Sequence, residues 1–100
     1  GKDYYNNGKL YFEGEYLNNE RKGKGKEYDF DGKLIFEGEY LNSKRNGKGI
    51  EYDFFDGKLI FEGEYLYDFK IKGKNYINGV LEYDGEYRLD RKCNGKGYDI

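Results

Sequence analysis

One ten-residue phrase occurs twice in this chain and twice more in weaker form. Gly-Lys-Leu-Ile-Phe-Glu-Gly-Glu-Tyr-Leu covers residues 32–41 and 57–66, and the weaker copies cover residues 8–17 and 79–89. The central glycines are 24, 25 and 22 residues apart, counted along Gly14, Gly38, Gly63 and Gly85. A phrase that recurs at such a period constrains the fold more than any single residue does, because every copy must form the same supersecondary unit. We expect one repeat domain over residues 1–100, with units of about 4–27, 28–51, 52–75 and 76–100.

Each unit alternates with the period of a β-strand. In the second copy, Phe36, Gly38 and Tyr40 share one face of the strand, while Glu37 and Glu39 share the other. An Asn-Gly or Asp-Gly pair precedes each copy, and such pairs favour type I′ hairpin turns: Asn7-Gly8, Asp31-Gly32, Asp56-Gly57 and Asn78-Gly79. The pattern predicts about eight strands in an all-β, elongated, single-layer antiparallel meander of stacked hairpins.

The opposite end of each hairpin is expected to be a polar loop, such as residues 18–22 and 42–46. A Gly-Lys-Gly phrase should then open the return strand at residues 23–25, 47–49 and 95–97. The third unit departs from this pattern, because Gly73-Lys74 is followed by Asn75 where the second glycine is expected.

Aromatic residues take the place of the aliphatic core that a chain with 38% charged residues lacks. Since a strand glycine leaves a slot that a neighbouring ring can cover, we expect the aromatic residues beside the central glycines to form one ladder. The ladder residues, which are also candidates for binding, are Phe12, Tyr16, Phe36, Tyr40, Phe61, Tyr65, Tyr83 and Tyr87.

The order Phe-Glu-Gly-Glu-Tyr, a loop with Asn and basic residues, Gly-Lys-Gly and an aromatic return to Asp-Gly resembles the MORN repeat. The likeness covers nearly the whole chain in four copies, and the longer units are similar to a variant, antitoxin-like class of bacteria and protists. The resemblance implies stacked β-hairpins in a single sheet. It also implies a non-enzymatic scaffold or adaptor, with phospholipid or cytoskeletal association in some members.

The loops of the hairpins suggest a basic edge. If the meander stacks regularly, one long edge gathers Arg21, Lys22, Lys44, Arg45, Lys70, Lys72, Arg88, Arg91 and Lys92. Two interpretations stay open: solvated hairpin tips, or a basic rim that binds an anionic partner such as lipid headgroups or an acidic protein surface. With 18 basic and 20 acidic residues the net charge is −2, which disfavours nucleic acid.

No constellation of residues points to catalysis, a cofactor or a metal. Acidic pairs such as Glu37 and Glu39 recur in every unit, so they indicate cross-strand pairing with lysines rather than acid–base chemistry. Asp29 and Asp31 resemble the start of a calcium loop, but turn chemistry explains them better. Cys93 stands alone and the chain has no His, which disfavours a nucleophile and excludes an internal disulfide.

A second face of the sheet should carry an exposed apolar stripe, because a thin sheet cannot cover both faces. The expected stripe comprises Tyr11, Leu17, Ile35, Leu41, Ile60 and Leu66. The leading hypothesis is therefore a non-catalytic module that binds a protein partner or itself, with a dimer allowed. Peripheral binding to anionic membranes and an antitoxin-like inhibitor are the alternatives. The lone cysteine and the lack of a long apolar run lead us to expect a cytoplasmic protein, with peripheral membrane attachment in the second case.

Overall fold

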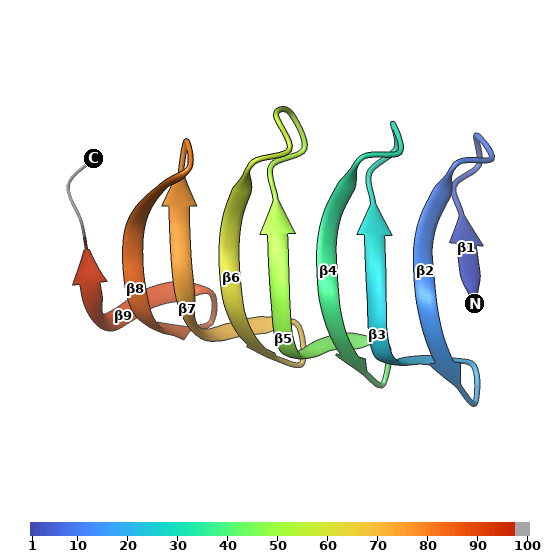
Figure 1. Ribbon diagram of the computed structural model, residues 1–100. Coiled ribbons are helices and arrows are strands. Elements are labelled where there is room, and N and C mark those ends of the chain that lie inside the picture. Colours follow the sequence, from blue (N-terminus) through green and yellow to red (C-terminus); the bar gives the residue numbers. More distant parts are fainter. Residues whose placement is uncertain (98–100) are drawn as a thin grey trace.

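The computed structural model describes residues 1–97 and shows nine antiparallel strands in one open sheet (Figure 1). The strands are β1 (Lys2–Tyr4), β2 (Leu10–Leu17), β3 (Glu20–Tyr28), β4 (Leu34–Leu41), β5 (Lys44–Tyr52), β6 (Leu59–Leu66), β7 (Phe69–Ile77), β8 (Val80–Arg88) and β9 (Arg91–Gly97). They follow one another in chain order, which confirms the predicted all-β meander. The additional strand is the short β1. The last three residues of the fourth expected unit lie outside the described part of the chain.

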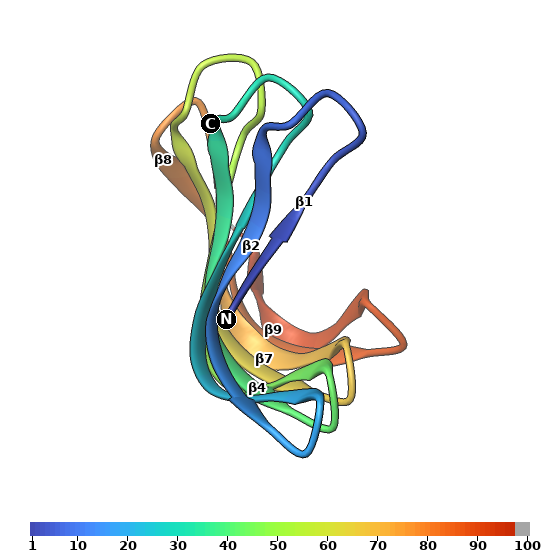
Figure 2. The same cartoon turned by 90° about the vertical axis from the view of Figure 1, so that its right-hand side faces the viewer.

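The sheet is a single curved layer. Its dimensions are 41 × 28 × 17 Å. Seen along the row of strands, the sheet bends so that the turns of the lower edge and the first loops of the upper edge reach toward the same side (Figure 2). The curvature gives the layer a concave face and a convex face, and a ring on the concave face can be covered from both edges.

Two-residue turns join the strands of each hairpin at one long edge, which we call the turn edge. The four turns are Asn18-Asn19, Asn42-Ser43, Tyr67-Asp68 and Leu89-Asp90, and both residues of each have φ between 45° and 74°. This is the backbone of a type I′ turn. The expected five-residue polar loops are therefore wrong, since residues 20–22 and 44–46 already belong to β3 and β5.

The Asx-Gly pairs lie at the opposite edge, and most of them are not two-residue turns. Only Asn78-Gly79 has positive φ at both residues, 52° and 78°. The other three pairs lie in the longer loops 5–9, 29–33 and 53–58. In the second loop, one carboxylate oxygen of Asp29 accepts hydrogen bonds from the backbone N–H groups of Asp31 and Lys33, both at 2.9 Å. This Asx turn accounts for Asp29 and Asp31 structurally, as the sequence indicates.

The turn edge holds neighbouring hairpins together. The Arg45 N–H donates to Asp68 Oδ1 at 2.7 Å, and the Asp68 N–H donates back to the Arg45 carbonyl at 2.8 Å. Arg21 and Ser43 make the same reciprocal pair at 3.0 Å in both directions. The second turn residue therefore needs a short polar side chain as well as a positive φ.

A row of eight glycines crosses the sheet from β2 to β9. Each is the direct cross-strand partner of the next: Gly14, Gly25, Gly38, Gly49, Gly63, Gly73, Gly85 and Gly95. A Cβ atom at Gly38 would lie 2.5 Å from the Lys48 carbonyl oxygen, so the backbones leave no room for a side chain. At Gly25 it would lie 2.5 Å from the Phe12 ring and 3.0 Å from the Tyr40 ring. The predicted slot therefore exists, and rings of two hairpins cover the return-strand glycines Gly25 and Gly49.

The register corrects the alignment of the third and fourth units. Gly73 pairs with Gly63, so Gly73 is the second glycine of its unit and Ile71 stands where the first glycine is expected. Asn75 then occupies the position of Glu27 and Glu51. Gly23 and Gly47, at φ of 82° and 103°, lie in wide bulges of the first two hairpins. In the third hairpin the register of β6 and β7 shifts by one residue only, so a glycine is not needed at position 71. Gly95 likewise pairs with Gly85 and is a second glycine.

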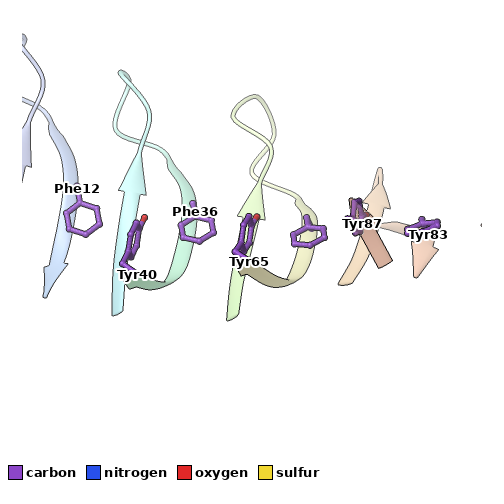
Figure 3. Close-up of a cluster of buried hydrophobic side chains, with 7 residues drawn as sticks. Phe12, Phe36, Tyr40, Tyr65, Tyr83 and Tyr87 are labelled. Atoms are coloured by element: carbon purple, nitrogen blue, oxygen red, sulfur yellow. The ribbon is translucent and has the colours of Figure 1, made fainter. Parts of the chain in front are cut away.

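Seven of the eight ladder residues form one buried core on the concave face (Figure 3). Edge-to-face contacts with centroid distances of 5.1–5.8 Å link the rings from Phe12 to Tyr40, Phe36, Tyr65, Phe61, Tyr87 and Tyr83. Tyr16 joins the row through Phe12. Since such pairs add stability beyond the area they bury, the row supplies a core that a single layer otherwise lacks. Every ring between the two ends of the row, Tyr16 and Tyr83, contacts a ring of its own hairpin and one of a neighbouring hairpin, as expected for a stacked repeat.

Candidate interaction surface

The structure divides the expected basic edge into two sets. Arg21 and Arg45 place their guanidinium carbons 3.9 Å from the ring centroids of Phe12 and Phe36. Lys70 and Lys92 lie over Phe61 and Tyr83 in the same manner, at 4.4 and 5.5 Å. These four cations cover the aromatic core and are cation–π partners of it.

The remaining basic residues face away from the core. Lys22, Lys44, Arg88 and Arg91 are exposed near the turn edge. Lys72 is also exposed and pairs with Glu64 at 3.1 Å. The division arises because the turns have only two residues, so strand alternation already separates Arg21 from Lys22 and Arg45 from Lys44.

Three of the four core cations, Arg21, Arg45 and Lys70, share a carboxylate with a core tyrosine. The Tyr40 hydroxyl donates to Glu27, which also pairs with Arg45 at 3.0 Å. Arg45 reaches Glu51 as well, at 3.2 Å, and Glu51 accepts the hydroxyl of Tyr65. Burial and, after it, the neighbouring carboxylate raise the pKa of Tyr40 and of Tyr65 far above the ordinary value. Both hydroxyls therefore remain protonated donors at neutral pH.

The first hairpin repeats this arrangement and the fourth changes it. Tyr16 donates to Asp3, which pairs with Arg21 at 3.3 Å. In the fourth hairpin Lys92 pairs with Glu82 instead of with residue 75. Asn75 donates its side-chain N–H to Glu82 at 3.1 Å. In this hairpin the carboxylate therefore lies on β8, at Glu82, and not on β7, at residue 75. The Tyr87 hydroxyl is left without a partner among the described residues.

A small polar cavity opens above the first two hairpins. It has a volume of about 320 Å³, and Arg21, Glu27, Tyr40, Ser43 and Arg45 line it together with Tyr11 and Asp68. The cavity thus brings together an expected ladder residue, Tyr40, with two expected basic residues. Glu27 and Ser43 were not expected there. The recurrence of Glu-Tyr after the glycines, at residues 27–28 and 51–52, is the sequence signal that could have indicated the acid.

The convex face carries alternating charges on both sides of the glycine row. Lys24 lies opposite Glu39, Lys26 opposite Glu37, and Lys72 opposite Glu86. This confirms that the recurring acidic pairs match lysines across strands. Between the charges lies a shallow groove of about 640 Å³ with Gly14, Gly25, Gly38 and Gly49 in its lining.

The expected apolar stripe does not form as one exposed surface. Tyr11 packs against the aromatic core because a bulge between Leu10 and Phe12 interrupts the alternation. Ile35, Leu41 and Ile60 are half-buried, and only Leu17 and Leu66 of the stripe are exposed.

Exposed apolar side chains lie instead near both long edges, with Phe30, Phe54 and Phe55 in the loops of one edge and a second set at the third and fourth turns. We call this second set the turn patch: Leu66, Tyr67, Phe69, Ile71 and Leu89, with exposures from 38% to 70%. Arg88 and Arg91, which are cross-strand partners in the fourth turn, border it. Sequence reasoning missed Tyr67, Phe69 and Leu89 because it placed these residues in a loop. Among residues 1–97 the structure contains no helix that could cross a membrane.

These features define a repeat-built β-sheet protein, in which each hairpin contributes rings, a glycine pair and a cation to one continuous layer. Residues 12–33 and 36–54 match the MORN repeat. The two segments coincide with the hairpins β2–β3 and β4–β5 and the loops that follow them. No curated protein matches the chain. MORN repeats are not an enzyme family and commonly bind proteins or membranes.

Proposed function

We propose that this protein is a non-catalytic repeat module that binds a protein partner through the turn patch and the adjoining concave face. The observation that carries the proposal is the turn patch itself. Leu89 is 70% exposed, although every ladder ring from Phe12 to Tyr87 in the buried core is nearly inaccessible. Several exposed apolar side chains on two neighbouring turns, next to a complete core, are typical of a docking site.

The rigid setting of the patch supports this proposal. Asp68 and Asp90, the second residues of the two turns, accept hydrogen bonds from the backbone N–H groups of Arg45 and Lys70 at 2.7 and 2.8 Å. The patch is thus fixed on the sheet before a partner arrives, which lowers the entropic cost of binding. The Arg88–Arg91 pair places two like charges opposite each other, and an acidic partner would relieve their repulsion.

We further propose that the repeat comprises all four hairpins, in the variant form that the sequence resembles. The continuous glycine row supports this extension beyond residues 12–54, since Gly63, Gly73, Gly85 and Gly95 continue it without interruption. A cytoplasmic location, where the single Cys93 stays reduced, belongs to the same proposal.

The experiment is affinity capture from the native source with matched variants. Leu89→Ser and Phe69→Ser should abolish capture of the partner, whereas Leu17→Ser should not, because Leu17 is a similarly exposed leucine at the first turn. Mass measurement of the purified protein in solution distinguishes self-association from a foreign partner. Capture that survives both patch variants would overturn the proposal.

Binding to an anionic membrane is the second candidate, favoured by Lys44, Arg88 and Arg91 beside exposed Leu66 and Leu89 on one edge. Such a surface would bind vesicles of phosphatidylcholine and phosphatidylserine in a salt-dependent manner. Lys44→Glu and Arg91→Glu should then prevent cosedimentation with the vesicles. Absent or salt-insensitive binding removes this candidate.

A further inference from the structure

One buried tyrosine hydroxyl of the core has no hydrogen-bond partner within the described part of the chain. The hydroxyls of Tyr16, Tyr40 and Tyr65 each donate to a carboxylate. Tyr87 is the next member of this series and is only 7% exposed, yet its hydroxyl has no partner among the described residues. Since buried polar groups are nearly always hydrogen-bonded, this exception requires an explanation.

The missing partner can be traced to one position of the repeat. Glu27 and Glu51 each lie in register with the core phenylalanines on both sides of their strand, and Asn75 has the corresponding place between Phe61 and Tyr83. The Asn75 amide is held by Glu82 at 3.1 Å and makes no hydrogen bond to Tyr87. The fourth hairpin therefore has the tyrosine of the arrangement without its carboxylate.

A cation lies beside the Tyr87 ring. The ammonium of Lys70 is 4.4 Å from the Phe61 ring centroid and 5.7 Å from that of Tyr87. Its carboxylate partner is Glu51, at 4.0 Å, and Glu51 is already shared with Arg45 and Tyr65. Lys70 thus keeps donors for a second acid. Burial raises the pKa of Tyr87 to about 12, so its hydroxyl is a donor at neutral pH.

We propose that the concave face at β7 and β8 is a subsite for a carboxylate supplied by a partner, held by the Tyr87 hydroxyl and the Lys70 ammonium. The ligand takes the place that Glu27 and Glu51 fill in the preceding hairpins. In a protein partner this group is an Asp or Glu side chain, and the neighbouring turn patch receives the apolar residues beside it. The Tyr87 hydroxyl is itself covered, so the ligand enters only if a neighbouring side chain moves. We expect that side chain to be the half-buried Asn75, because it has the position of the missing carboxylate.

The source of the carboxylate rests on the proposed function, but the subsite can be tested on the purified protein alone. Tyrosine side chains labelled with ¹³C are observed by NMR at neutral pH while sodium acetate is added, and sodium chloride at equal ionic strength is the control. Tyr87→Phe assigns the Tyr87 signal. We expect a saturable shift of the Tyr87 ring carbon with acetate and none with chloride. The absence of a saturable shift, or an equal shift with chloride, overturns the subsite.

A second variant tests the position itself. Asn75→Glu supplies the carboxylate within the chain, so it should shift the Tyr87 signal without acetate, make it insensitive to acetate, and raise the melting temperature above that of Asn75→Gln. If Asn75→Glu melts below Asn75→Gln and leaves the Tyr87 signal unchanged, the site does not accept a carboxylate. Failure of partner capture with an intact acetate response would contradict the proposed function and not the subsite.

Discussion

The ring of Phe36 lies directly over Gly49 of the neighbouring strand, and a Cβ atom at Gly49 would be 2.7 Å from the ring. On its other side the same Cβ would be 2.9 Å from the Tyr65 ring of the next hairpin. Contact between repeats thus depends on the absence of a side chain at this position, which links the glycine row to the stacking of the aromatic core.

Gly49→Ala should therefore destabilise the protein although alanine is the smallest possible addition. Both rings must move, and overpacking of this kind costs about 1–3 kcal/mol. Chemical denaturation followed by circular dichroism measures the change. Lys48→Ala is the control in the same strand, because Lys48 is exposed, and its effect should stay within about 0.5 kcal/mol. Equal stability of Gly49→Ala and the wild type would show that the Phe36 and Tyr65 rings do not exclude a side chain at position 49.

Arg45→Met should be destabilising while Lys44→Met is nearly neutral. Arg45 is the cation shared by Glu27 and Glu51, and its side chain is only 24% exposed. Its removal leaves two partly buried carboxylates without that partner, at a cost of about 1–3 kcal/mol. Lys44 precedes it in the same strand and is exposed. Comparable losses in the two variants would mean that the core cations are surface charges after all.

Asp68→Ala should loosen the turn edge. It removes the acceptor for the Arg45 N–H and leaves an alanine at φ of 74°. We expect a loss of about 1 kcal/mol for the hydrogen bond, with the backbone strain in addition. Asp68→Asn keeps an acceptor and tolerates positive φ, so it should preserve stability. Hydrogen exchange of the Arg45 amide measures the effect locally, and unchanged protection in the alanine variant would contradict the docking of the turn.

Stability should fall at alkaline pH. Burial and the carboxylates of Glu27 and Glu51 raise the pKa of Tyr40 and Tyr65, and the hydrogen bond to Glu37, followed by burial, raises that of Tyr52 to about 12. A raised folded-state pKa contributes stability that is complete below about pH 10, the unfolded value, and is lost as pH rises toward the folded pKa. Thermal melts between neutral pH and pH 12, with phenolate absorbance recorded in parallel, check this. Constant stability across that window would contradict the burial of the tyrosines.

The sequence is sufficient to predict the strands and the ladder, because the alternation in residues 34–41 leaves Phe36, Gly38 and Tyr40 on one face. It fails at the hairpin ends. The Asp-Gly dipeptides at residues 31–32 and 56–57 predict two-residue turns strongly. They lie instead in longer loops, where aspartate side chains accept hydrogen bonds from backbone N–H groups of the loop. Two-residue turns such as Tyr67-Asp68 have weak local preference, and their contact with the preceding hairpin fixes them.

The placement of the cations was missed for the same reason. Because each turn has only two residues, Arg21 and Arg45 lie on the aromatic face of the sheet. The amino-acid composition of the loops does not indicate this placement. The bulge at Tyr11 could not be predicted either, because the residues around it show no break in their pattern although the strand register shifts there. The differences between copies at Asn75 and in the turn patch are clear only when the units are aligned by strand register.

The most direct test of partner binding places a photoreactive phenylalanine at position 89 in one variant and at position 17 in another. Both positions lie at turns and are exposed to solvent, at 70% and 52%. After irradiation in the native source, we predict that the position 89 variant forms a covalent adduct with one protein, and that the position 17 variant does not. The Phe69→Ser substitution should remove this adduct. Equal labelling at both positions, or none at position 89, would contradict the central claim.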